Sequence, residues 1–408
     1  MNKKEEIVPK LRFPEFQENG IDFVHGNKLF KSITNKNHNS DLPILAITQD
    51  QGAVPRDQIE YNVTVTDKSL SNYKVVEVGD FIISLRSFQG GIEYSRFKGI
   101  CSPAYIILRK REENISELYY KYFFKTWKYI QSLNRNLEGI RDGKMISYSQ
   151  FSSVKVPYPR SFKEQQKIAD CLSSIDELID AEIRKLKALE KYKKGLMQKL
   201  FPAEGKTLPE WRFPEFQGCG EWKSKSVGKA CKMFSGGTPD TSKKEFYGGA
   251  IPFIRSAEIN ESSTELFITE EGFKNSSAKM VKKGDILIAL YGANSGEVAL
   301  SKIDGAINQA ILCLRHETNN VFVYHYFTHM KNRIISKYIQ GGQGNLSAQI
   351  IKSVNLYFPK TEEQQKIADC LSEIDTIIAE QSNKVEQLKA HKKGLMQGLF
   401  PSLEEADV

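Results

Sequence analysis

Apolar residues recur at steps of three, four and seven in two stretches of the chain, residues 164–202 and 363–401. This spacing places the apolar side chains on one face of an α-helix. Neither stretch contains proline before its last residue, or glycine before Gly195 and Gly394, so each helix can run unbroken for roughly 30 residues, or about 45 Å. A narrow apolar stripe on such long helices predicts coiled-coil packing. The residues predicted to pack between the helices are Ile168, Leu172, Ile175, Ile179, Leu186 and Leu189 in the first stretch, and Ile367, Leu371, Ile374, Ile378, Val385 and Leu388 in the second.

The two stretches are copies of each other. Cys171 aligns with Cys370, and about 24 of the 39 aligned positions are identical, which indicates an internal duplication. A second segment, Arg-Phe-Pro-Glu-Phe, is also repeated, at residues 12–16 and 212–216. The chain therefore consists of a tag, a variable region and a long helix, written twice.

The variable regions differ in sequence but share a skeleton. Residues 78–85 correspond to residues 283–290, and each predicts a turn followed by a short apolar strand. Further on, a helical pattern covers residues 117–133 in the first region and 321–338 in the second. The predicted fold class is α+β, with two mixed α/β domains separated by two long antiparallel coiled-coil helices and an internal pseudo-two-fold repeat. The predicted segments are a tag (1–16), a first domain (17–160), a central spacer helix (161–202), a linker with the second tag (203–216), a second domain (217–360), a distal spacer helix (361–401) and a disordered tail (402–408).

Charge indicates how the helices run. Their first halves are acidic and their second halves are basic, so an antiparallel pair sets acid against base. The alternative is that each is an ordinary amphipathic helix within its own domain. Leu178, Ile377 and the two Gly-Leu-Met-Gln segments lie partly off the seam, and we expect this apolar surface to bind partner proteins.

The bulk composition narrows the class of protein. The formal net charge is +8 and the pI is near 8.9, which permits a polyanionic partner. The first residues have no apolar core for a signal peptide, and no apolar run is long enough to span a membrane, so we expect a cytoplasmic protein. The six cysteines show no CxxC spacing and are expected to be reduced. His325 and His329 are four apart without an intervening glutamate, which favours a structural helix over a metal site.

The repeated helices and tags, together with Gly236-Gly-Thr-Pro-Asp240 and Phe246-Tyr-Gly-Gly-Ala-Ile-Pro-Phe253, strongly resemble the specificity subunit of type I restriction–modification systems. The resemblance covers essentially the whole chain. The first variable region departs from it, because Pro43-Ile-Leu-Ala-Ile-Thr48 stands in the place comparable to the second region's Gly-Gly-Thr-Pro segment. The resemblance implies two target recognition domains, each reading half of a bipartite DNA target. It also implies that the helices fix the spacer between the half-sites.

The resemblance further implies which partners and cofactors to expect. The helices would dock two methyltransferase subunits, and restriction subunits would join through the methyltransferase. S-adenosylmethionine, ATP and Mg would belong to these partners, and this chain would bind no cofactor. Because the two variable regions differ, the double-stranded DNA target should be asymmetric.

The residues themselves encode no catalytic motif. We find no Asn/Asp-Pro-Pro-Tyr for base methylation and no GxxxxGK[ST] for nucleotide phosphates. A non-catalytic subunit is therefore expected. The alternatives are a single-chain restriction enzyme or DNA methyltransferase, and a coiled-coil adaptor that does not bind DNA.

DNA readout needs side chains that bind base edges and others that bind phosphate. Amide side chains suit adenine, and arginines suit guanine or phosphate. The candidates in the first domain are Arg86, Ser87, Gln89, Arg96, Arg135, Asn136, Arg141 and Lys144, and those in the second are Ser235, Thr238, Arg255, Tyr291, Asn294, Gln340, Gln343 and Asn345.

Overall fold

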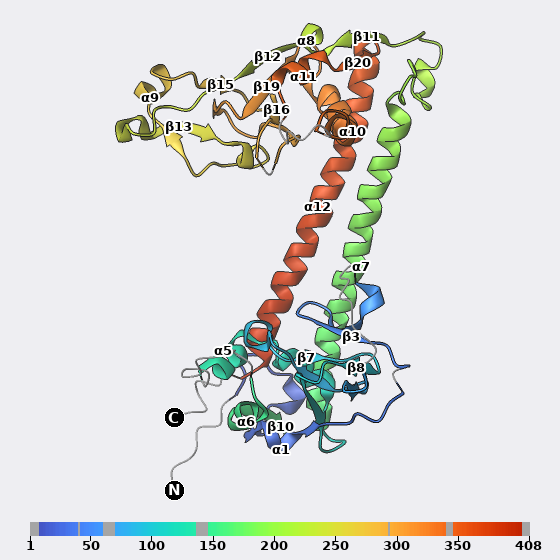
Figure 1. The fold of residues 1–408 in the computed structure, drawn as a ribbon, viewed down its shortest axis with the longest axis vertical. Helices are drawn as coiled ribbons and strands as arrows, with labels where there is room; N and C mark the ends of the chain where they lie inside the picture. Colours follow the sequence, from blue (N-terminus) through green and yellow to red (C-terminus); the bar gives the residue numbers. More distant parts are fainter. Residues whose placement is uncertain are drawn as a thin grey trace. The chain divides into compact units, whose positions relative to one another are not determined.

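The computed structural model describes residues 8–39, 41–59, 70–135, 146–292, 294–339 and 346–401. The chain divides into two compact units, unit 1 (Met1–Glu182 and Lys384–Val408) and unit 2 (Ile183–Asn383). The division falls within two long helices, α7 (Phe162–Leu200, green in Figure 1) and α12 (Thr361–Leu399, red). Each unit therefore contains one variable region together with part of both helices.

In unit 1 the central element is an antiparallel sheet in the order β2-β9-β6-β7. Its middle strands are covered on both faces, since Phe81 and Ile83 enter one apolar cluster while Ile82 enters another. This burial explains why the strand is apolar throughout rather than alternating. The elements of unit 1 before α7 are η1 (Pro14–Phe16), β1 (Ile21–His25), α1 (Gly26–Leu29), β2 (Phe30–Ile33), β3 (Leu45–Thr48), β4 (Gly52–Pro55), η2 (Arg56–Gln58), β5 (Lys74–Val76), β6 (Phe81–Ile83), α3 (Ser87–Gly90), β7 (Glu93–Tyr94), β8 (Gly99–Cys101), β9 (Ile106–Lys110), α4 (Glu117–Phe123), α5 (Trp127–Arg135), α6 (Tyr148–Ser153) and β10 (Lys155–Pro159).

Unit 2 repeats this skeleton with an antiparallel sheet in the order β12-β19-β16-β17. A second sheet, β14-β13-β18-β15, stands where unit 1 has the separate pairs β3-β4 and β5-β8. The elements of unit 2 before α12 are η3 (Pro214–Phe216), β11 (Lys223–Ser226), α8 (Val227–Ala230), β12 (Cys231–Ser235), η4 (Lys244–Phe246), β13 (Tyr247–Ile254), η5 (Ser256–Glu258), β14 (Phe267–Ile268), α9 (Glu270–Lys274), β15 (Lys279–Val281), β16 (Ile286–Ala289), β17 (Val298–Leu300), β18 (Gly305–Ile307), β19 (Ile311–His316), α10 (Asn320–Ile339), α11 (Ala348–Ser353) and β20 (Asn355–Phe358).

The helices pair antiparallel, as the charge pattern predicted. In unit 1, Lys392 forms an ion pair with Asp176, and Lys384 forms one with Glu182 at 2.5 Å. As the residue number rises along α7, the number of its partner in α12 falls, so the two helices run antiparallel. In unit 2, Lys193 forms the repeat-equivalent ion pair with Asp375. All twelve residues predicted to pack between the helices are buried or half-buried.

The ends of the helices enter the cores of the units, and this corrects part of the prediction that their apolar side chains bind partners. Met197 and Leu200 belong to the main apolar cluster of unit 2, and Leu399 and Phe400 belong to that of unit 1. In the Gly-Leu-Met-Gln segments Met197 is buried, and Leu196, Leu395 and Met396 are half-buried against the domain cores, so much of this apolar surface packs within the chain. Leu178 and Ile377, by contrast, are 43% and 46% exposed, as expected.

The repeated tags join the two helices within each unit. In unit 1, the backbone N–H of Leu11 donates to the Gly398 carbonyl at 2.9 Å, near the end of α12. The next residue, Arg12, donates two hydrogen bonds to Glu164 at the start of α7, at 2.7 and 3.0 Å. The tag therefore connects the end of one helix to the start of the other. In unit 2 the same contacts recur, from Trp211 to Lys199 and from Arg212 to Glu363.

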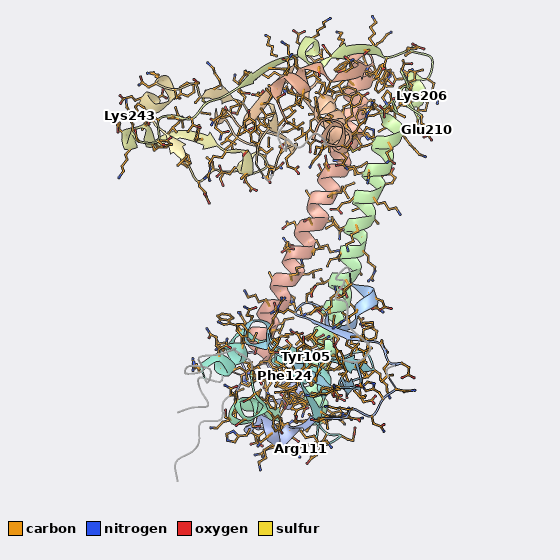
Figure 2. All side chains as sticks on the ribbon, in the orientation of Figure 1. Tyr105, Arg111, Phe124, Lys206, Glu210 and Lys243 are labelled. Carbon is orange, nitrogen blue, oxygen red and sulfur yellow. The ribbon has the colours of Figure 1, made fainter. Side chains whose placement is uncertain are left out.

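The first variable region contains one departure from the predicted secondary structure. The helix predicted over residues 117–133 is two helices, α4 and α5, whereas α10 of unit 2 is continuous. At the break, the Thr126 hydroxyl donates to the Phe123 carbonyl at 2.8 Å. The neighbouring Phe124, labelled in Figure 2, is completely buried. The break also places Lys125 beneath a loop that carries several candidate DNA contacts.

Candidate nucleic-acid interface

The loop that follows β6 in unit 1 carries three of the candidate DNA contacts. Its backbone is fixed by local hydrogen bonds, because the N–H of Ser84 donates to the Ser87 hydroxyl at 2.9 Å and that of Arg86 to the Ser84 hydroxyl at 3.2 Å. The loop ends at Gly91, whose φ of 82° lies in the left-handed region. A Cβ at this position would lie 2.2 Å from the Phe124 carbonyl oxygen, so only glycine fits.

The predicted residues of the first domain take different positions. Arg86 and Gln89 are exposed on the loop, whereas Ser87 is 1% exposed and supports the loop from inside. Arg135 is exposed at the end of α5, next to Asn134, whose amide donates to the Phe88 carbonyl of the loop at 2.7 Å. The loop and the end of α5 therefore form one surface.

The remaining candidates of the first domain lie apart from that surface or outside the described residues. Arg96 is exposed, and its charge acts on Lys121, whose pKa is lowered to about 8 by burial and by Arg96. Arg96 is thus near Lys121 of α4. Asn136, Arg141 and Lys144 lie outside the described residues.

A buried ion pair that the sequence analysis missed holds the loop of unit 1. The Lys125 ammonium donates to the carbonyls of Gln49 and Gly90 at 3.1 and 2.9 Å, and to the Glu93 carboxylate at 2.5 Å. Glu93 is 2% exposed, and burial raises its pKa to about 7, although Lys125 opposes the rise. One lysine therefore ties together three segments that are distant in the sequence.

The equivalent loop of unit 2 follows β16. Here Tyr291 is 41% exposed and Asn294 is half-buried. The Ser295 hydroxyl donates to the Leu290 carbonyl at 3.0 Å and closes the loop. Lys331 of α10 forms an ion pair with Glu297, as Lys125 does with Glu93. In the sequence, the only sign of these ion pairs is a lysine and a glutamate flanking each loop. Neither residue belongs to a repeated motif, so the pairs were not predicted.

The Gly-Gly-Thr-Pro segment of unit 2 forms a tightly packed loop after β12. The Thr238 hydroxyl donates to Gln309 at 2.8 Å, and the Tyr247 hydroxyl donates to the Pro239 carbonyl at 2.7 Å. A Cβ on Gly236 would lie 1.7 Å from the Ile307 carbonyl oxygen. Of the two candidates here, Thr238 is exposed and Ser235 is half-buried in β12. The segment therefore holds Thr238 at the surface beside an amide side chain.

Arg255 is engaged within unit 2. Its guanidinium donates to Glu258 at 2.9 Å and to Glu265 at 2.8 Å. The hydrogen bonds from Arg255 lower the pKa of Glu258 to about 2, so this carboxylate is ionised at neutral pH. A DNA contact by Arg255 would have to compete with both acids. Gln340, Gln343 and Asn345 lie outside the described residues.

The part of the chain that the structure describes contains no group of three or more His, Cys, Asp or Glu side chains that could hold a metal ion. His325 is 1% exposed, and burial lowers its pKa to about 3, so the ring is neutral at physiological pH. None of the described helices is both long and apolar enough to cross a membrane.

Comparison with known proteins gives a consistent answer. Residues 21–191 and 220–390 each match the family model of the type I restriction modification DNA specificity domain. A putative type I restriction enzyme MjaX specificity subunit of Methanocaldococcus jannaschii is 26% identical over 302 residues, which cover 71% of this chain and 69% of the relative. The MjaVIII specificity subunit of the same organism is 23% identical over 352 residues, covering 82% and 80%. The fold is similar to a crystal structure of a type I restriction-modification S subunit from M. genitalium, with a TM-score of 0.59 and 16% identity over 97% of this chain and 99% of that chain.

Proposed function

Since this chain belongs to the type I restriction modification DNA specificity family and has two recognition domains, we propose that each domain reads one half of a bipartite, asymmetric DNA target. The observation that carries the proposal is that equivalent loops present different side chains. The loop after β6 exposes Arg86 and Gln89, and the loop after β16 exposes Tyr291 and presents Asn294. Different side chains at equivalent places suit two different half-sites.

Repeated contacts around these loops support the proposal. Arg109 donates to Asp80 at 2.7 Å in unit 1, and Arg315 donates to Asp285 at 2.7 Å in unit 2. Both aspartates follow the glycine of the turn before the central strand. The framework is thus duplicated while the reading side chains vary, as independent recognition modules require.

A domain replacement tests the proposal. Residues 17–160 are exchanged for the first variable region of another family member, and the methylated sites in a host genome are then mapped. One half-site should change while the other stays the same. A new target without any relation to the original half-sites would contradict independent reading.

We further propose that the chain is non-catalytic and docks two methyltransferase subunits, which supply S-adenosylmethionine binding and recruit ATP- and Mg-dependent restriction subunits. Leu178 and Ile377 are repeat-equivalent, exposed and apolar, so the duplication offers the same docking patch twice. Light scattering of the saturated complex should give two methyltransferases per chain. The purified chain should neither methylate nor cleave DNA with S-adenosylmethionine and Mg present, and a stable one-to-one complex or product from the chain alone would contradict this.

A further inference from the structure

One exposed face of α7 carries a run of basic residues that α12 lacks. Arg184, Lys187, Lys191 and Lys194 are separated by three, four and three residues, and all four are exposed. At 3.6 residues per turn they lie within about 80° of arc and along about 15 Å of the helix. Leu186 and Leu189, which are half-buried, lie on the opposite side. We call these four residues the α7 basic face.

The basic face is not neutralised within the chain. None of the four side chains forms an ion pair with another described residue, whereas the neighbouring Lys193 is paired with Asp375. Glu190 is the single acid between Arg184 and Lys194, and it too has no ion pair among the described residues. Like charges three and four positions apart destabilise an isolated helix. Their accumulation therefore works against folding unless a partner with opposite charge binds there.

The duplication provides an internal comparison. The four positions correspond to Asn383, Glu386, Ala390 and Lys393 in α12, so only one cation is retained. The other lysines in this part of α12 form ion pairs: Lys384 with Glu182, Lys389 with Glu386 and Lys392 with Asp176. A partner that docks through the repeat would find its site on both helices. The α7 basic face instead serves a contact made once per chain.

We propose that the α7 basic face binds the phosphate backbone of the DNA duplex whose half-site is read by unit 2. The inference rests on the proposed function and adds a contact that does not depend on base sequence. The small or polar residues Ala188, Gly195 and Gln198 lie on or beside this face. The exposed aromatic residue Tyr192 lies about 80° around the helix beyond its edge, so it is not at the centre of the face. Protein interfaces are enriched in aromatic residues and depleted of lysine at their centres, whereas phosphate binding needs regularly spaced lysine and arginine.

The test compares two variants with the same change in charge. Lys187→Gln with Lys191→Gln removes half of the basic face, and Lys389→Gln with Lys393→Gln removes two exposed charges from α12. In the full-length chain assembled with methyltransferase, affinity for a target duplex and for a random duplex is measured between 50 and 200 mM salt. Circular dichroism confirms that both variants retain their helices.

The α7 variant should lower the slope of log affinity against log salt by about 1.8, since each phosphate contact contributes about 0.9. The loss of affinity in the α7 variant should be the same for the target duplex and the random duplex. The α12 variant should leave the slope nearly unchanged. An equal change of slope in both variants overturns the inference. So does an α7 variant that keeps the wild-type slope in an assay where the wild-type complex binds its target. Loss of subunit assembly with an unchanged DNA slope would show a protein contact instead and would also overturn it. If the wild-type complex fails to prefer its target, the proposed function itself fails.

Discussion

Lys125 shows how one side chain can hold the backbone of a candidate recognition loop in place. It binds the Gln49 and Gly90 carbonyls and the Glu93 carboxylate, and it sits where α4 and α5 break. The sequence predicted the exposed Arg86 and Gln89 because arginine and amide side chains suit base edges. It could not predict the lysine, because its role depends on a helix break and on contacts between distant segments.

Glu93 should make the local stability of this loop depend on pH. Burial raises its pKa from 4.5 to about 7, so the folded state holds its proton more tightly than the unfolded state does. Its contribution is therefore fully present below pH 4.5 and is lost as the pH rises through 7, by at most about 3 kcal/mol. Hydrogen exchange of β7 should show opening that becomes easier from pH 5 to 7.5 in the wild type. Glu93→Gln should remove this dependence, and an equal dependence in both proteins would contradict the assignment.

At Gly91 we predict an effect of substitution that depends on a steric clash as well as on the positive φ. Gly79 and Gly91 both have positive φ, 93° and 82°, but only Gly91 faces a backbone atom, the Phe124 oxygen at 2.2 Å from a built Cβ. Gly79→Ala should cost about 1–2 kcal/mol for the left-handed conformation, since its near neighbour is the flexible Glu117 side chain. Gly91→Ala should cost more and should weaken recognition of the first half-site. Denaturation and half-site binding measure the two effects, and equal stability losses would refute the steric argument.

At the scale of elements, the sequence predicted the long helices and their antiparallel pairing but not how their ends are used. The apolar periodicity of α7 and α12 is regular, and the charge gradient sets acid against base. The periodicity cannot tell a partner-binding residue from a core residue, however, and Met197 and Leu399 complete the domain cores. The helix predicted over 117–133 is broken in unit 1 for a similar reason, because tertiary contacts override a favourable local pattern.

The tags give an element-scale prediction. The Arg12 and Glu164 side chains are 5% and 0% exposed, whereas those of Arg160 and Asp22 form a similar two-bond pair at 68% and 42% exposure. Arg12→Gln leaves a buried carboxylate without its cation and should destabilise unit 1 by about 3–5 kcal/mol. Arg160→Gln should cost less than about 1 kcal/mol. The measurement is the free energy of unfolding of each variant. Similar losses of stability in the two variants would show that the tag does not hold the two helices together.

At the scale of the whole molecule, the duplication explains which features the sequence revealed. The repeated tags and helices follow from aligning the chain with itself. The charge gradient of the helices predicted acid against base, and the Asp176–Lys392 and Lys193–Asp375 pairs agree with it. The loops after β6 and β16 differ in sequence between the copies, so their supporting contacts could not be found in this way. The candidate base contacts in the described residues accordingly remain predictions, apart from the burial of Ser87 and the internal pairing of Arg255.

The last prediction concerns the length of the two long helices. We predict that α7 and α12, both of which continue from one unit into the other, set the length of unread DNA between the half-sites. Four residues inserted after Arg184 and after Asn383, which are repeat-equivalent, lengthen each helix by about 6 Å, or about two base pairs at about 3.4 Å each. A four-residue insertion locally unwinds a coiled coil but keeps its seam. Methylome mapping should therefore show unchanged half-sites and a spacer longer by one or two base pairs. A folded variant with the original spacer would show that the helices do not set the separation.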